Sequence, residues 1–322
     1  MTSLRTRPLV FTGEGIDPAD LAHATRLMLE SELAVIGRSD TTAADVAAMV
    51  AVSSFDRENS CFALEGDEPV GFLAVEDDPH EGVTNLEVYS LPWPGSAPLR
   101  AALLERGLEV ARARRAGSVG PTWRARAGCY VEDTTFSSLM VDAGMAPVRR
   151  FYRMTIDSDS PLVPATMPPL PSGVEIRSGA ADEQDRRTVH RIDRESFAEH
   201  WGYAEYPFDE WWEHMSAWPT FDPDDWWLLS VEGEPAAICL LSERRAQFAE
   251  GYVLVLGVLK EFRGRGLAQL LLRRAFVHYR DRGRTSTSLG VDATNTTGAV
   301  ALYEKVGMRP TLVMEAYEHP LD

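Results

Sequence analysis

The sequence predicts an α/β (α+β) protein with two tandem copies of one domain, each a mixed, largely antiparallel sheet flanked by helices. The 322 residues are enough for two domains at about 100–200 residues each. A segment with five prolines, residues 158–173, lies near the midpoint of the chain. Because proline fixes φ and disfavours helix in the residue before it, this segment is predicted to be an extended, semi-rigid connector.

A weak internal repeat supports the duplication. LMVDAGMAP at 139–147 matches LYEKVGMRP at 302–310, and GDEPVGFL at 66–73 matches GEPAAICL at 233–240. The two matches occur in the same order and at nearly the same separation, which is hard to obtain by chance. We therefore expect a first domain at 1–157, a proline-rich linker at 158–173 and a second domain at 174–322.

Each half shows the same order of elements, which is typical of an α+β domain. Asp17 and Pro18 indicate a helix start, because they are suited to the capping position and the first helical position. The other elements expected in the first half are a hairpin at 61–75 that turns at 66–69, a strand at 84–91 and a helix at 97–113. The second half is expected to contain helices at 182–200, 267–279 and 298–306, and strands at 226–231, 236–241, 251–258, 286–292 and 312–317.

The composition excludes several classes of protein. Cys61, Cys129 and Cys239 form no closely spaced pair, so neither a disulfide framework nor a metal site is expected, and a reducing cytoplasm fits best. No signal peptide is visible, and the longest apolar run, 252–256, is far shorter than the ~20 residues of a membrane span. The net charge of −17 argues against broad nucleic-acid binding.

The segment with the most chemical information is 253–272, in which a strand leads into RGRG at 263–266 and then directly into an amphipathic helix. A helix N-terminus presents unpaired N–H groups and about half a positive charge, so it attracts anions. Glycines let the backbone approach a ligand, and the two arginines, with two more at 273 and 274, add donors for phosphate. The pattern is neither a Walker loop nor a dinucleotide fingerprint. The alternative is a glycine turn that only caps the helix.

This loop and helix resemble the GNAT N-acetyltransferase superfamily. RGRGLA at 263–268 fits that superfamily's Arg/Gln-x-x-Gly-x-Gly/Ala pattern, which binds the pyrophosphate of coenzyme A. The resemblance implies that acetyl-CoA or another acyl-CoA is the cofactor. It assigns the pantetheine arm, held like an added strand, to Leu256, Gly257 and Val258, and the pyrophosphate to Arg263, Gly264, Arg265, Gly266, Leu267 and Ala268.

A second segment extends the resemblance. VDATNTTGAVALYEKVGM at 291–308 is similar to the superfamily's Asn…Ala…Leu-Tyr-x-x-x-Gly-Phe segment, with Met308 in place of Phe. The resemblance implies that Asn295 contacts the cofactor and that Tyr303 is the general acid for the departing thiolate. Without the glycine loop before it, this tyrosine would be interpreted as a core residue. The two-domain architecture resembles the tandem GNAT group that includes mycothiol synthase.

The first half lacks both motifs. SLPWPGSAP at 90–98 stands where the loop is expected, and the repeat places Met140 opposite Tyr303. A thioether cannot donate a proton, so we predict a degenerate first domain that transfers no acyl group. Gly95 and Ser96 still precede a helix, which leaves open whether coenzyme A is retained there as a structural ligand.

The general base is not evident from the sequence. Many members of the superfamily carry Glu or Asp on the strand before the pyrophosphate loop, but here Leu254 stands at about that position. The candidates for the base are Glu250 at the start of the strand, Asp292 at the end of the next strand, and His200. A residue in the position of Glu250 is more often a solvated strand end, and one like His200 is more often a satisfied surface histidine.

Six of the eight tryptophans lie between 201 and 227, interspersed with acidic residues. Aromatic rings with carboxylates suit a cationic amine acceptor through cation–π contacts and ion pairs. The alternative is that these tryptophans pack the interface between the two domains.

These observations predict an acyl-CoA-dependent N-acyltransferase that acts on a small amine-bearing metabolite, with cofactor and chemistry in the C-terminal domain. The alternative is a catalytically inactive acyl-CoA-binding or sensing protein, and transfer to a protein amine is a weaker possibility. The expected partners are acyl-CoA and a small-molecule amine, with no nucleic acid and no membrane, in a cytoplasmic monomer or homodimer.

Overall fold

The computed structural model describes residues 5–13, 15–39, 41–117, 123–216, 220–294 and 298–321. The chain divides into two compact units, Met1–Arg150 with Met314–Asp322, and Phe151–Val313. Within the described ranges, every helix is too short or too polar to cross a membrane.

The first unit is built on a sheet with the strand order β1-β4-β5-β6-β7-β14. Its elements are β1 (Thr6–Pro8), β2 (Phe11–Thr12), β3 (Gly15–Ile16), α1 (Pro18–Ile36), α2 (Ala43–Ala51), β4 (Cys61–Glu65), β5 (Glu68–Asp78), β6 (Val83–Ser90), α3 (Ser96–Gly117), β7 (Trp123–Tyr130), α4 (Thr134–Asp142) and the start of β8 (Ala146–Asp157). One core, with Leu86 and Leu104, lies under α3, and another, with Leu27 and Phe72, lies under α1 and α2.

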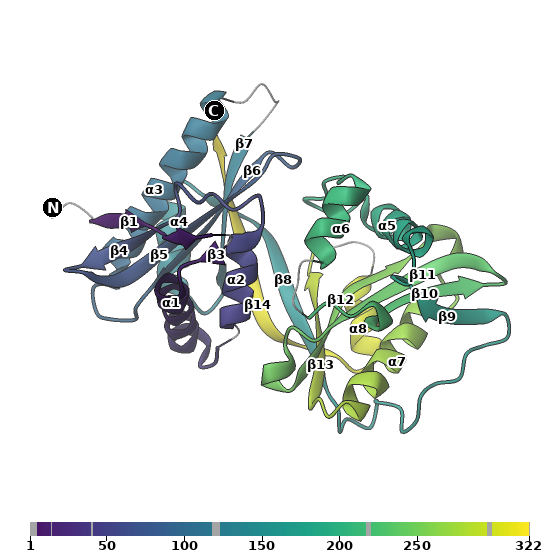
Figure 1. Ribbon diagram of the computed structural model, residues 1–322. Helices are drawn as coiled ribbons and strands as arrows, with labels where there is room; N and C mark the ends of the chain where they lie inside the picture. Colours follow the sequence, from purple (N-terminus) through teal and green to yellow (C-terminus); the bar gives the residue numbers. More distant parts are fainter. Residues whose placement is uncertain are drawn as a thin grey trace. The chain divides into compact units, whose positions relative to one another are not determined.

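The second unit has the strand order β9-β10-β11-β12-β13-β8. Its elements are β9 (Val174–Ser178), α5 (Glu183–Phe197), α6 (Phe208–Ser216), β10 (Trp226–Val231), β11 (Glu234–Ser242), β12 (Glu250–Val258), α7 (Leu267–Asp281), β13 (Ser286–Asp292), α8 (Ala299–Lys305) and the start of β14 (Arg309–Leu321). Helices α5 and α6 cover one face of this sheet, and α7 and α8 cover the other (Figure 1).

Two long strands, β8 and β14, contribute residues to both units. Residues 151–157 of β8 pair antiparallel with β13 in the second unit. Residues 314–321 of β14 pair antiparallel with β7 in the first unit. The edge of each sheet is therefore completed by a strand that begins in the other compact unit, so the compact units differ from the two sequence repeats.

The expected fold class is confirmed: both units are mixed, largely antiparallel sheets flanked by helices. The order of elements recurs, since a hairpin, strand, helix, strand, helix and strand follow α2 in one unit and α6 in the other. Asp17 caps α1 as predicted, because its carboxylate accepts from the N–H groups of Ala19 and Asp20. The proline pattern at 158–173 forms neither helix nor strand.

The proline-rich segment lies along α7. The Arg280 guanidinium donates to the carbonyl oxygens of Pro164 at 2.6 Å and Ala165 at 3.2 Å, and Arg274 donates to that of Pro168. Val163 is buried in the same core as α7. Arg274 is therefore occupied by the connector, which differs from its expected place in a basic cluster at the glycine loop.

Tyr279 anchors the α7 side of the second unit, and its loss is expected to destabilise that unit. The fully buried hydroxyl donates to the carbonyl oxygens of Ser242 and Tyr252 and accepts from the Ser242 N–H. In Tyr279→Phe these backbone groups lose their partner, so the free energy of unfolding should fall by about 1–3 kcal/mol. Urea denaturation followed by tryptophan fluorescence measures the change. Tyr303→Phe is the control, and an equal loss in both variants would contradict this account.

Candidate functional site

Strands β12 and β13 run parallel for only part of their length and then separate. Four residue pairs join them, from Glu250 with Ser286 to Val253 with Leu289, whereas β12 continues to Val258. On its other edge, β12 stays paired with β11 up to Val258 and contains a bulge at Leu254. The backbone of 254–258 therefore presents an edge toward the gap, where an extended ligand can pair as an added strand.

The glycine loop connects this edge to the N-terminus of α7. Gly264 and Gly266 have φ of +77° and +80°, which favours glycine, and a Cβ at either position would meet nothing within 4 Å. Gly266 is the N-cap of α7, and no side chain among the described residues caps this end. The first N–H groups of α7 are thus available to an anion, which the helix dipole also favours.

Arg263 and Arg265 are exposed, and their side chains hydrogen-bond to backbone carbonyl oxygens just before the loop. The Nε of Arg263 donates to the Val258 carbonyl oxygen at 3.0 Å, and Arg265 donates to that of Glu261 at 3.3 Å. The guanidinium of Arg265 also lies 5.0 Å from the centre of the Phe262 ring. Both arginines add positive charge beside the uncapped helix terminus.

Gly257 is required for packing rather than for ligand approach. A Cβ there would lie 2.9 Å from Ser196 Oγ and 3.2 Å from the Ile238 side chain. The buried Ser196 Oγ has no hydrogen-bond partner among the described residues. Sequence reasoning missed Ser196, because only the packing of α5 against β12 brings this hydroxyl to the separated half of the strand.

Tyr303 lies on the α7 side of the sheet, near the separated half of β12. It is 8% exposed and shares a core with Cys239 and Leu256, which are directly opposite each other on β11 and β12. Burial, with a smaller contribution from Cys239, raises the pKa of Tyr303 to about 12. The phenol therefore keeps its proton at neutral pH.

Glu250 lies at the start of β12, at the opposite end of the strand from the glycine loop. Its carboxylate forms an ion pair with Arg245 at 3.1 Å and accepts a hydrogen bond from Ser288. These contacts hold the beginning of β12 beside β13, where the two strands are still paired.

His200 and Asp292 belong to different segments of the chain and interact electrostatically. Burial lowers the pKa of His200, the nearby Asp292 carboxylate opposes this shift, and Arg263 adds to it. Asp292 ends β13, and its carboxylate accepts from the N–H and hydroxyl of Thr294. Asn295, the residue expected to contact the cofactor arm, lies outside the described residues.

Three of the tryptophans, Trp211, Trp212 and Trp226, form a core within the second unit, which corrects both expectations for these three. Trp226 is 2% exposed and makes edge-on contacts with Trp211, Trp212 and Phe221. The cation at Trp212 is the chain's own Arg186, 4.5 Å from the ring centre. These rings therefore stabilise α5 and α6 within the second unit. Trp218 lies outside the described residues, and Trp201 differs from the core group, since it contacts the Phe151 ring beside Asp292.

Comparison with known proteins decides the family. Residues 186–308 match the Acetyltransferase (GNAT) family. A mycothiol acetyltransferase of Thermobispora bispora is 30% identical over 254 residues, which cover 76% of this chain and 77% of the relative. The chain belongs to the GNAT acetyltransferase family. A mycothiol acetyltransferase of Thermomonospora curvata is 27% identical over 82% of this chain and 86% of its own length.

Solved structures share the fold of this GNAT acetyltransferase over its whole length. A GCN5-related N-acetyltransferase from Sphaerobacter thermophilus has a TM-score of 0.80 at 23% identity and covers 100% of this chain and 96% of its own. A tandem GNAT protein from the clavulanic acid biosynthesis pathway has a TM-score of 0.77 at 14% identity, with 99% of each chain covered. The family match and the curated relatives confirm the GNAT resemblance inferred from the glycine loop and show that the protein is an N-acetyltransferase.

The uncapped end of α7 gives a direct test with acetyl-CoA. In Gly266→Glu a carboxylate and a strained backbone replace the open glycine, so we expect the thermal stabilisation by acetyl-CoA to be lost. Gly283→Glu is the matched control, since Gly283 follows the other end of α7 with φ of +78° and the same open surroundings. An acetyl-CoA shift that survives in Gly266→Glu, or is lost equally in both variants, would contradict this site.

Proposed function

We propose that this GNAT acetyltransferase transfers the acetyl group of acetyl-CoA to the amine of a small metabolite, with cofactor and chemistry in the second unit. The observation that carries the proposal is the gap between β12 and β13, which opens beside the uncapped N-terminus of α7. We keep 1–157, 158–173 and 174–322 as the limits of the two sequence repeats and their linker.

The residues of the second unit fit acetyl-CoA. The open edge at Leu256, Gly257 and Val258 suits the amide-containing pantetheine arm, which can pair with it like a strand. The N–H groups of Gly264, Arg265, Gly266, Leu267 and Ala268 suit the pyrophosphate, whose negative charge the helix terminus favours. The unpartnered Ser196 hydroxyl adds one polar group beside Gly257.

Acetyl-CoA supplies the acetyl group as a thioester. His200, neutral at pH 7 because burial lowers its pKa, accepts the proton that the amine loses as the new N–C bond forms. Tyr303 donates its proton to sulfur as the C–S bond breaks, and burial keeps that proton in place beforehand. Asp292 lies close enough to stabilise a protonated His200. The contacts of Glu250 with Arg245 and Ser288 favour His200 over Glu250 as the base.

The names of the relatives suggest which acceptors to test first. Several are mycothiol acetyltransferases, so deacetylated mycothiol belongs in the amine panel beside amino sugars and simple alkylamines. Trp201 and Phe151 lie beside Asp292 and provide an aromatic wall with a carboxylate, which suits a cationic acceptor.

Tyr303→Phe separates an enzyme from an acyl-CoA-binding protein without activity. The variant lacks the proton donor, so kcat for thiol release on the amine panel should fall by about 10²–10⁴-fold while Kd for acetyl-CoA stays unchanged. Equal kcat values in both proteins would remove Tyr303 from the mechanism. Thiol release no faster with any amine than in water would favour the inactive binding protein.

The pH profile tests His200. Since the neutral form is the base, kcat/KM should fall only at pH values below the usual 6.5 of histidine, following the lowered pKa of His200. Asp292→Asn removes the neighbouring negative charge that raises this pKa, so the acid limb should move to lower pH. In His200→Gln the acid limb of the kcat/KM profile should disappear, and kcat/KM should fall by about 10²-fold. The exposed His214→Gln is the control, and an acid limb unchanged in both His200 and Asp292 variants would exclude this base.

A further inference from the structure

Arg263 connects the glycine loop to the C-terminal end of α5. Its backbone leads into Gly264 and Gly266, while its Nε donates to the Val258 carbonyl oxygen at 3.0 Å. Its Nη2 donates to the Ser196 carbonyl oxygen at 3.5 Å. One guanidinium therefore contacts both the last residue of β12 and the penultimate residue of α5.

The place of this contact on α5 suits a cation. The last carbonyl groups of a helix lack partners within the helix and carry the negative end of its dipole. Ser196 precedes Phe197, the last residue of α5, so the Arg263 guanidinium lies at that end. Gly257 lets the same turn of α5 approach β12, since a Cβ there would lie 2.9 Å from Ser196 Oγ. The end of α5 is thus contacted by the backbone of β12 and by the arginine of the loop.

His200 follows directly after this helix end. Its N–H donates to the Phe197 carbonyl oxygen at 2.8 Å, and its ring lies edge-on to the Phe197 ring with 4.6 Å between the ring centres. Burial lowers the pKa of His200; Asp292 at the end of β13 opposes this shift, Arg263 adds to it, and the adjacent Glu199 opposes it. Arg263 therefore acts on His200 both through the helix end and through its charge.

Arg265 lies in the same loop and is also exposed, but its contacts are local. It donates to the Glu261 carbonyl oxygen at 3.3 Å, and its guanidinium lies 5.0 Å from the centre of the Phe262 ring. The two arginines thus carry the same charge beside the start of α7, while the printed contacts of Arg263 extend to α5.

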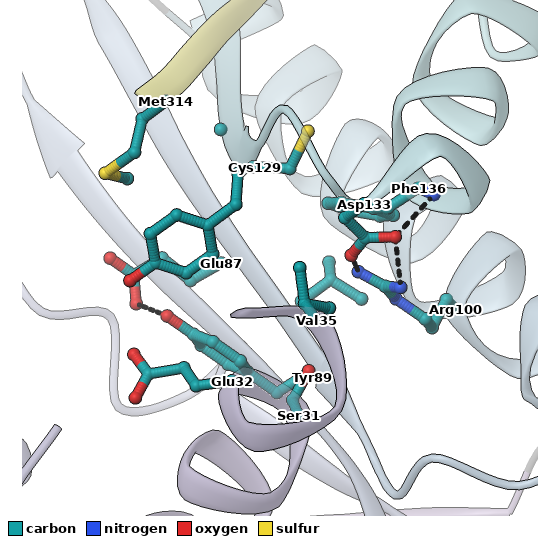
Figure 2. Close-up of a pocket in the computed structure, with 13 residues that line it drawn as sticks. Ser31, Glu32, Val35, Glu87, Tyr89, Arg100, Cys129, Asp133, Phe136 and Met314 are labelled. Atoms are coloured by element: carbon teal, nitrogen blue, oxygen red, sulfur yellow. Dashed lines mark hydrogen bonds and ion pairs between the residues drawn. The ribbon is translucent and has the colours of Figure 1, made fainter. Parts of the chain in front are cut away.

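The corresponding gap of the first unit places its arginine differently. Strands β6 and β7 separate after Leu86 and Ala127, and a cavity of about 130 Å³ lies beside them (Figure 2). Arg100 of α3 lines this cavity and donates to both carboxylate oxygens of Asp133, the N-cap of α4, at 3.1 and 2.6 Å. Helices α3 and α4 share one core, so this guanidinium is neutralised on its own face of the sheet. In the second unit the arginine instead reaches α5, on the face opposite α7.

We propose that Arg263 is a positioning residue, which holds the C-terminal end of α5 beside the end of β12 and through it positions His200. The proposal rests on the proposed function, in which His200 is the base, and on the two carbonyl contacts of Arg263. The backbone of one loop then serves the pyrophosphate, while a side chain of the same loop serves the acceptor side of the reaction.

NMR titration of the imidazole signals in the full chain tests this role, and His200→Gln identifies the signal of His200. Arg263→Gln removes the positive charge and both carbonyl contacts, so the pKa of His200 should rise. Arg265→Gln is the matched control, because it removes the same charge from the same loop. Both variants should raise Kd for acetyl-CoA by about 2–5-fold, but Arg265→Gln should leave the pKa of His200 unchanged. Arg263→Lys keeps the charge and should return this pKa toward its original value.

The acid limb of kcat/KM is the second readout, measured with the amine of the panel that reacts fastest. In Arg263→Gln the limb should move to higher pH, opposite to the shift expected for Asp292→Asn, because a positive rather than a negative neighbour is lost. Above the limb, kcat/KM should fall by about 3–10-fold in both Arg263→Gln and Arg263→Lys, since neither side chain has the planar fork that spans the two carbonyl groups.

An equal pKa of His200 in Arg263→Gln and Arg265→Gln would overturn the positioning role, whatever the activity of the variants. A pKa that rises only in Arg263→Gln, with an acid limb that stays in place, would support the positioning role and exclude His200 as the base. The two outcomes therefore separate a failure of this inference from a failure of the proposed function.

Discussion

The separation of β12 from β13 after four residue pairs is the constraint on which the candidate site depends. If β12 and β13 were paired along their whole length, the backbone N–H and C=O groups of 254–258 would be hydrogen-bonded to β13. The loop at 263–266 would then have no unpaired strand edge beside it. The ion pair of Glu250 with Arg245 and its hydrogen bond from Ser288 hold the paired end, while the bulge at Leu254 lies where the pairing stops. Bulges strengthen local twist, which is consistent with strands that diverge from this point.

The same strand geometry serves different chemistry in the two units. In the second, the gap lies beside the N-terminus of α7, which no described side chain caps, and near the buried Tyr303. In the first, Arg100 and Asp133 neutralise each other, Met140 is fully buried at the place that matches Tyr303 in the repeat, and Glu87 faces a cavity. The two units thus share one strand geometry but differ in the side chains beside it.

Sequence reasoning succeeded where the signals are local. The strand, glycine loop and amphipathic helix of 251–281 are encoded within one stretch, and the hairpin turn at Gly233 follows from a few residues. It failed where a side chain's surroundings are assembled from distant segments. From the sequence alone, the tryptophans around Trp226 fit an acceptor-binding surface and a packed core equally well. The composition does not show which face of α6 is covered by other residues. Ser196 has no pattern around it, and the pairing of β8 with β13 requires tertiary contacts.

Hydrogen–deuterium exchange of the full chain with and without acetyl-CoA tests the central claim most directly, because it locates the cofactor without any substitution. The account predicts slower exchange at 254–258 and at 264–270, where the strand edge and the first turn of α7 gain hydrogen-bond partners. The corresponding segments of the first unit, 87–90 and 91–100, should exchange at unchanged rates. Protection confined to those first-unit segments, with none at 264–270, would contradict the assignment of cofactor and chemistry to the second unit.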